Sequence, residues 1–302
     1  MYRSDFCMAG AFRDVFLFRD FQRLRALLLL IALLAFSLYL MRFFRVISTY
    51  PPSFFGIPSA ASLLGGALYG AGMVLGGGCL FGTLYRLGGG SMLSAITFCG
   101  VLTGGLALTV LYPFVVSFAH STALFSDKTA LENIIGNAAD PAFAASLLII
   151  VLAWSGRKKR NKPQRGYARG YLTPWKASLL MALVIGTLLA ISGRPLAINM
   201  GFEKLSGLLG TAMLPSVTGK FSFFHIQRPR LLYGSILSGG PGPGFDAIAI
   251  SQLPLMAGIA GGAYISSLRL GGFKLIPPPA RQAFSAFSGG ILMAVGAFMA
   301  GG

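Results

Sequence analysis

The chain has 302 residues, of which 55% are apolar or aromatic (AVILMFWYC) and only 11% are charged. So few charges do not cover the surface of a soluble domain of this size, and the high apolar content excludes a disordered chain. The 41 glycines have no period of three, which excludes a collagen-like helix. We therefore expect an all-α polytopic membrane protein, in which glycine lets neighbouring helices approach closely.

Basic residues greatly outnumber acidic ones, with 25 lysines and arginines against eight aspartates and glutamates and a formal net charge of +17. Long apolar runs separate the basic residues, so they form no continuous face for nucleic acid. In membrane proteins, lysine and arginine concentrate in cytoplasmic loops. The longest basic run, Gly156 to Gly170, holds seven of them. We expect it to be a cytoplasmic loop of a multi-pass membrane protein.

Apolar runs of about 20 residues predict membrane-spanning helices. In chain order, we expect spans at Arg25–Phe44, Ser59–Gly78, Ser91–Phe118, Trp175–Ile191, Phe245–Leu268 and Phe284–Gly302, with a shorter one at Pro141–Trp154. Leu205–Leu214 is apolar but too short to cross alone. The basic run divides the chain into a first transmembrane half (1–155), a cytoplasmic linker (156–174) and a second transmembrane half (175–302).

Two motifs of the first half recur in the second. Arg3–Gly10 aligns with Arg194–Gly201, and Gly65–Gly78 aligns with Gly289–Gly302, where five glycines coincide. The offsets of the two alignments differ, so the second half carries an insertion, to which we assign Gly240–Gly244. Short, glycine-interrupted apolar segments at corresponding places in two halves are typical of a transport site. We therefore expect two repeated halves that contain short, broken helical segments.

The run Gly70–Gly90 is the motif with the clearest chemistry, because three consecutive glycines lead directly into Cys79. Glycine backbone breaks a helix and lets the chain approach a ligand closely. The free N–H groups of a restarting helix bind anions. The motif therefore predicts a helix break that presents Cys79 to a permeating solute. The alternative is a glycine-lined helix crossing with a buried cysteine.

A second motif, Arg3–Asp14, places Cys7 among charged residues in a segment too polar for a plain span. The alternative is an amphipathic leader with an incidental cysteine. Cys99 lies within an apolar run, and we expect it to be a packing residue. No CxxC pair is present, so we expect no structural zinc site and no other metal site.

Arg3–Asp14 followed by Gly70–Gly90 is similar to the YeeE/YedE family of bacterial membrane proteins. Members of that family transport sulfur compounds, and the best defined carry thiosulfate inward. Ser192–Gly207 resembles the family's second-half loop, and Gly289–Gly302 resembles the lead-in to its final Gly-Gly-Cys motif. The chain ends one residue before that cysteine, so we expect it to be truncated.

The resemblance implies an all-α fold of two pseudo-symmetric halves, with broken, re-entrant helical loops at the membrane centre. It also implies that motif cysteines line the substrate path. By motif position, Cys7 and Cys79 take that role. The residues that we expect along the path are Cys7, Cys79, Gly77, Gly78, Gly82, Arg3, Arg86, Arg194 and Asn199.

Thiosulfate is a dianion with a soft terminal sulfur, and the predicted site suits it. A thiol in an apolar site stays neutral and can donate a weak S–H hydrogen bond. Helix N-termini and nearby arginines would offset the charge of the anion. We therefore expect a transporter or channel for uptake of a sulfur-containing anion, most specifically thiosulfate, and not an enzyme. Its expected partners are the anion, the lipid bilayer and a cytoplasmic sulfur-carrier protein, with no cofactor and no nucleic acid.

The main alternative is a membrane-embedded sulfurtransferase or thiol-redox protein that forms a cysteine persulfide. Against it, neither motif cysteine lies in a CxxC pair, and both histidines lie outside the cysteine motifs. Three acids near the broken segments, Asp5, Glu203 and Asp246, are candidates for a proton relay. Each could equally be a solvated loop residue, which is the interpretation that we favour.

Overall fold

A computed structural model describes residues 2–44, 59–123, 147–148, 150–152, 171–192, 198–213, 223, 240, 242 and 244–300. These residues form helices and connecting turns, and no strand is found among them. The chain divides into two compact units. Unit 1 comprises residues 1–51, 130–196 and 231–234, and unit 2 comprises the remaining segments.

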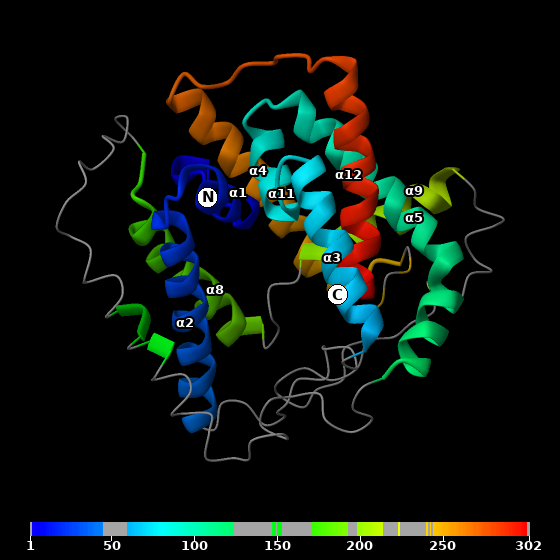
Figure 1. Cartoon of the computed structure of the whole chain (residues 1–302), viewed down its shortest axis with the longest axis horizontal. Helices are drawn as coiled ribbons and strands as arrows, with labels where there is room; N and C mark the ends of the chain where they lie inside the picture. The colour runs from blue at the N-terminus through cyan, green and yellow to red at the C-terminus, as the bar shows by residue number, and fades with distance from the viewer. Residues whose placement is uncertain are drawn as a thin grey trace. The chain divides into compact units, whose positions relative to one another are not determined.

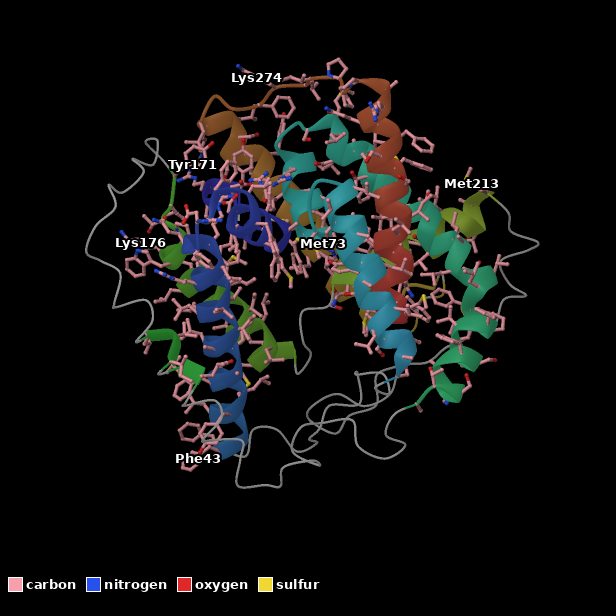
Figure 2. All side chains as sticks on the ribbon, viewed as in Figure 1. Phe43, Met73, Tyr171, Lys176, Met213 and Lys274 are labelled. Carbon is pink, nitrogen blue, oxygen red and sulfur yellow. The ribbon has the colours of Figure 1, made fainter. Side chains whose placement is uncertain are left out.

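Unit 1 contains η1 (Tyr2–Ser4), α1 (Met8–Phe18), α2 (Gln22–Phe43) and α8 (Pro174–Ser192). The leucine-rich helix α2 packs along α8, and α1 packs against α2. Small residues on both long helices, Ala26 and Ala182 among them, allow a close fit, and Phe6 and Leu30 complete the buried cluster. The other faces of the two helices remain apolar and exposed, as on Phe43 at the end of α2 (Figure 2).

Unit 2 contains the remaining long helices. These are α3 (Ala60–Leu75), α4 (Leu80–Gly88), α5 (Met92–Ser121), α9 (Ile198–Met213), α11 (Ala247–Arg269) and α12 (Ala280–Met299). Helix α12 packs on both α3 and α5, α4 packs on α11, and α9 packs on α5 and α11.

Glycines set the distance between α3 and α12, which lie side by side in Figure 1. A Cβ atom at Gly72 would lie 2.6 Å from the backbone nitrogen of Met293, and one at Gly296 would collide with the backbone of Tyr69. In the same way, a Cβ at Gly65 would collide with Ala300, and one at Gly289 with Gly76. The two backbones are thus in direct contact, which is how apolar helices associate when small residues line their crossing.

Within the part of the chain that the structure describes, six helical segments are long and apolar enough to span a membrane: Gln22–Met41, Ala60–Gly88, Met92–Ser121, Pro174–Ile191, Ala247–Arg269 and Ala280–Met299. Each overlaps one of the six full spans that hydropathy predicts. The second of them joins α3 and α4 across the glycine run. Most of the shorter predicted span, Pro141–Trp154, and all of the basic run, residues 156–170, lie outside the described residues.

Helix α9 departs from the sequence-based expectation, which treated only Leu205–Leu214 as an apolar segment. The helix begins at Ile198 and therefore includes Glu203 and Lys204. Both charged side chains are buried. Polar residues that look like part of a loop are here inside a packed helix of unit 2.

Candidate functional site

Cys79 lies where one helix of unit 2 ends and the next begins. Helix α3 ends at Leu75, the three glycines follow, and Cys79 is the N-cap residue of α4. Gly77 has a φ of +71°, a conformation that residues with a Cβ rarely adopt. The predicted break in the helix is therefore present, and it places the cysteine at the start of a helix.

The Cys79 side chain is 8% exposed and faces the first turn of α4. The backbone N–H of Gly82 donates a hydrogen bond to Sγ of Cys79 at 3.4 Å. The hydroxyl of Thr83 donates to the Cys79 carbonyl at 3.1 Å. The sulfur thus occupies the position of a capping oxygen, next to backbone N–H groups of a kind that also bind anions.

Two side chains from different helices hold the glycine run. The guanidinium of Arg86, in the last turn of α4, donates a hydrogen bond to the Gly77 carbonyl. The hydroxyl of Thr97 on α5 lies 3.2 Å from the Gly76 carbonyl and 3.0 Å from that of Leu93. The loop before Cys79 is therefore attached to α4 and to α5.

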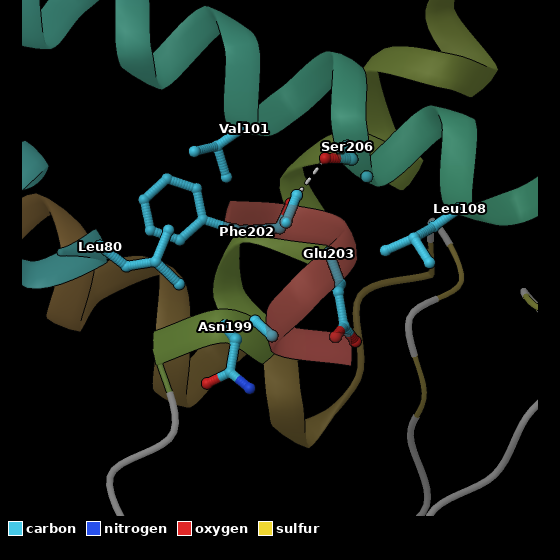
Figure 3. Close-up of a pocket in the computed structure, with 10 residues that line it drawn as sticks. Leu80, Val101, Leu108, Asn199, Phe202, Glu203 and Ser206 are labelled. Atoms are coloured by element: carbon cyan, nitrogen blue, oxygen red, sulfur yellow. Dashed lines mark hydrogen bonds between the residues drawn. The ribbon is translucent and has the colours of Figure 1, made fainter. Parts of the chain in front are cut away.

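A cavity of about 20 Å³ lies beside the start of α4, large enough for about one water molecule (Figure 3). Its wall is mostly apolar and includes Leu80, the residue after Cys79. Helix α9 contributes Asn199, Glu203 and Ser206. The hydroxyl of Ser206 donates to the Phe202 carbonyl at 2.9 Å, shown as the dashed line in Figure 3. Asn199, expected on the substrate path, is thus close to the helix that Cys79 caps.

Next to Glu203, Lys204 is fully buried and paired. Its Nζ lies 2.6 Å from Oδ2 of Asp246 and donates to the Gly240 carbonyl at 3.0 Å. The other oxygen of Asp246 accepts from the N–H groups of Ile248 and Ala249, which caps α11. The ion pair therefore ties α9 to the start of α11.

The expectation that Glu203 and Asp246 are solvated loop residues is wrong. Glu203 is 7% exposed within α9, and Asp246 is a capping residue in an ion pair. Burial by itself raises the pKa of the Asp246 carboxyl, but hydrogen bonds from Lys204, Ala249 and Gly240 and the charge of Lys204 outweigh it and hold the pKa below its usual range. Asp5 in unit 1 has a side chain that is 41% exposed.

In unit 1, Cys7 has a position like that of Cys79, since it is the N-cap residue of α1 and is 4% exposed. Arg23 of α2 lies 3.3 Å from Asp5 and 3.1 Å from Asp14. A Cβ atom at Gly10 would lie 3.5 Å from Nη1 of Arg23 and 3.7 Å from Cβ of Cys7. The arginine and the cysteine thus border the same small space at the start of α1.

The other expected path residues are placed as follows. Arg3 lies in η1, and its carbonyl accepts a hydrogen bond from the N–H of Leu172 at 2.9 Å. Gly77, Gly78, Gly82 and Arg86 surround Cys79 within unit 2, whereas Arg194 lies outside the described residues. The expectation that Cys99 packs in the interior is wrong, because its side chain is exposed on α5.

Sequence reasoning did not single out Thr97, Lys204 or Arg23 as residues of these sites. Thr97 is one threonine in an apolar run, and nothing in the sequence shows that its hydroxyl contacts the glycine run between α3 and α4. Lys204 and Asp246 are 42 positions apart, so their pairing depends on the fold. Arg23 precedes a predicted span, where a basic residue ordinarily marks only the membrane surface.

Among the described residues, six helical segments are long and apolar enough to span a membrane, and one of them is broken at a glycine run. Such a set defines a multi-pass membrane protein and is typical of proteins that transport solutes. The family model for sulphur transport matches residues 3–302. The chain therefore belongs to the sulphur transport family, the YeeE/YedE family that its motifs resemble. A comparison with curated proteins gives no match.

Proposed function

We propose that the protein carries thiosulfate across the bacterial inner membrane into the cell, with Cys79 as one binding step. The observation that carries this proposal is the buried thiol of Cys79 at the N-terminus of α4. The thiol and a set of backbone N–H groups lie together there. The thiol suits the soft terminal sulfur of thiosulfate, and the N–H groups suit its charged oxygens.

Backbone N–H groups at the start of α4 are the partners best suited to offset the charge of the anion. The N-terminus of a helix carries a partial positive charge and unpaired donors. The N–H of Gly82 already donates to Sγ of Cys79, so a rotation of the cysteine would release this donor to an arriving oxygen. A weak site of this kind lets the ion leave as well as enter.

We further propose two pseudo-symmetric halves around the path, with Cys7 as a second binding step. Support comes from the contact between α3 and α12. Under the alignment of Gly65–Gly78 with Gly289–Gly302, the contact of Gly65 with Ala300 becomes that of Gly289 with Gly76. The contact of Gly72 with Met293 becomes that of Gly296 with Tyr69. A local two-fold axis relates such contacts.

The remaining path residues are part of the same proposal. Arg3, Arg194 and Asn199 would supply charge and hydrogen bonds beside the two cysteines, and Gly77, Gly78 and Gly82 would keep the backbone accessible. A cytoplasmic sulfur-carrier protein would accept the sulfur after entry, and residues 156–170 would face it. No residue in this proposal changes covalently.

The test is uptake of radiolabelled thiosulfate into proteoliposomes that contain the purified chain. We expect uptake above that of empty liposomes, inhibited by unlabelled thiosulfate and much less by sulfate, which has no soft sulfur. No uptake under any gradient would contradict the proposal. A stable sulfur adduct on Cys7 or Cys79, found by mass spectrometry without uptake, would favour the sulfurtransferase instead.

A further inference from the structure

We propose that Arg86 is a positioning residue that acts together with Thr97 to fix the loop before Cys79, and that it is not a ligand of the anion. This inference rests on the proposed function of Cys79. It assigns different roles to the two groups of one motif: the thiol meets the substrate, and the arginine holds the backbone that presents the thiol.

The first argument is the direction of the Arg86 side chain. A cation in an anion path would be expected to point at the ion. The guanidinium instead donates to the Gly77 carbonyl, nine residues earlier in the chain. A Cβ atom at Gly78 would lie 3.4 Å from Nη1 of Arg86, so the guanidinium also covers the neighbouring glycine.

The second argument is that the glycine loop needs these two hydrogen bonds, from Arg86 and Thr97, which we call the brace. Three consecutive glycines lose more conformational freedom on ordering than any other tripeptide, and Gly77 adopts a positive φ. Without outside contacts, this loop would sample many conformations and Cys79 would not hold one position. A hydrogen bond from a charged donor is stronger than one from a neutral donor, which suits Arg86 to this purpose.

The third argument is that the brace has two independent anchors. Arg86 attaches Gly77 to the end of α4, while Thr97 attaches Gly76 to α5. The two carbonyls are consecutive, and the two donors come from different helices. Helix α12 also packs closely against the loop, because a Cβ atom at Gly76 would lie 2.9 Å from the end of the Met293 side chain. The start of α4 is thus fixed relative to its neighbours.

The test measures the reactivity of the Cys79 thiol separately from transport. The purified full chain is treated with N-ethylmaleimide, and the alkylation rate of each cysteine is followed by peptide mass spectrometry. The variants are Arg86→Gln, Arg86→Lys and Thr97→Val. Arg269→Gln is the matched control, because Arg269 is an exposed arginine in the last turn of α11.

We expect Arg86→Gln and Thr97→Val each to raise the alkylation rate of Cys79 about tenfold, as expected when a restraining hydrogen bond is lost and the loop opens. Arg86→Lys keeps a charged donor and should restore part of the protection. Arg269→Gln should leave the rate unchanged. In uptake, Thr97→Val and Arg86→Gln should lower the maximal rate and change KM by a smaller factor.

Different results would overturn the proposal. A ligand role predicts that Arg86→Gln raises KM about tenfold or more while alkylation of Cys79 stays at the wild-type rate. If Arg86 acts only through its positive charge, Arg86→Gln should slow the alkylation of Cys79. Thr97→Val should then leave the rate unchanged, because it removes a hydroxyl and no charge. If Arg86→Gln does not insert, Thr97→Val decides alone: unchanged alkylation contradicts the brace.

The alkylation measurement needs no transport. If the wild-type chain fails to take up thiosulfate, the proposed function is wrong, but the rates for Arg86→Gln and Thr97→Val still test the brace. If uptake occurs and the rates do not change, the brace is wrong and the proposed function stands.

Discussion

At the scale of single residues, the position of Cys79 as a helix cap makes a serine substitution informative. Serine is similar in size, keeps a donor and is among the best N-cap residues, so Cys79→Ser should start α4 as well as the native cysteine does. It loses only the soft sulfur. We expect thiosulfate uptake to fall about tenfold or more, because one substrate contact is lost at the binding step.

The matched control is Cys99→Ala, which removes a thiol from the exposed face of α5. It should leave uptake and protein amount unchanged. Cys7→Ala should act in the same direction as Cys79→Ser. If Cys79→Ser takes up thiosulfate at the wild-type rate and equal expression, the thiol is not a binding step. The helix N-terminus alone would then hold the anion.

The sequence predicts some of these residues and not others for a physical reason. A cysteine directly after three glycines is a local signal, so the helix break at Cys79 follows from nearby residues. The brace from Thr97 and the pair of Lys204 with Asp246 are contacts between distant parts of the chain. A buried lysine inside an apolar helix is understandable only when its partner is known.

At the scale of elements, the crossing of α3 with α12 yields a prediction about stability. Gly72→Ala adds a methyl group 2.6 Å from the backbone nitrogen of Met293, where no space exists. We expect it to destabilise the fold by about 1–3 kcal/mol, as overpacking does. The measurement is thermal unfolding of the purified protein in detergent.

Gly66→Ala is the matched control, because a Cβ atom at Gly66 on the same helix meets nothing within 4 Å. Alanine has the higher helix propensity, so this variant should be as stable as the native chain or more stable. Equal stability of Gly72→Ala and Gly66→Ala would show that the α3–α12 crossing is looser than its backbone contacts indicate.

The pair of Lys204 and Asp246 allows a second test of element packing. Asn at position 246 can still cap α11, so Asp246→Asn removes the charge and keeps the cap. It leaves the ammonium of Lys204 buried without its carboxylate, which costs about 3 kcal/mol. We expect a clear drop in thermal stability at neutral pH.

The effect should depend on pH with a definite sign. Because the pKa of Asp246 is held below its usual range, the stabilisation from its charge is present above about pH 4 and is lost as pH falls further. The stability gap between wild type and Asp246→Asn should therefore narrow on acidification. A gap of constant size from pH 7 to the acid range would mean that charge is not what stabilises the pair.

The element-scale predictions from sequence succeeded where hydropathy alone decides. Six long apolar runs became six candidate spans, because the backbone in a membrane must satisfy its own hydrogen bonds in helices. The start of α9 was missed for the opposite reason. A Glu-Lys pair lowers the local hydropathy, and hydropathy does not show that Lys204 has an internal counter-charge.

At the scale of the whole molecule, both units combine segments from early and late parts of the chain. Unit 1 joins α1 and α2 with α8, and unit 2 joins α3, α4 and α5 with α9, α11 and α12. Cys7 and Cys79 belong to different units. The proposal therefore assigns one binding step to each unit, and the loss of either cysteine should lower thiosulfate uptake.

The orientation of the whole chain in the membrane follows from its charge asymmetry. Seven lysines and arginines in residues 156–170 should hold this loop in the cytoplasm, since positive loops are poorly translocated. The segment 121–140 carries three of the eight acids and lies one predicted span earlier, so it should face the periplasm. Cysteines placed at these two sites, as Lys162→Cys and Ala130→Cys, distinguish the two faces.

In intact cells, an impermeant thiol reagent should label Ala130→Cys and not Lys162→Cys, and both should react after the membrane is permeabilised. The native cysteines should contribute little background labelling, because Cys7 and Cys79 are buried and Cys99 lies within a candidate span. If only Lys162→Cys is labelled in intact cells, the orientation is the opposite of the one predicted. The basic loop would then face away from any cytoplasmic sulfur carrier, and delivery of sulfur to that partner would need another surface of the protein.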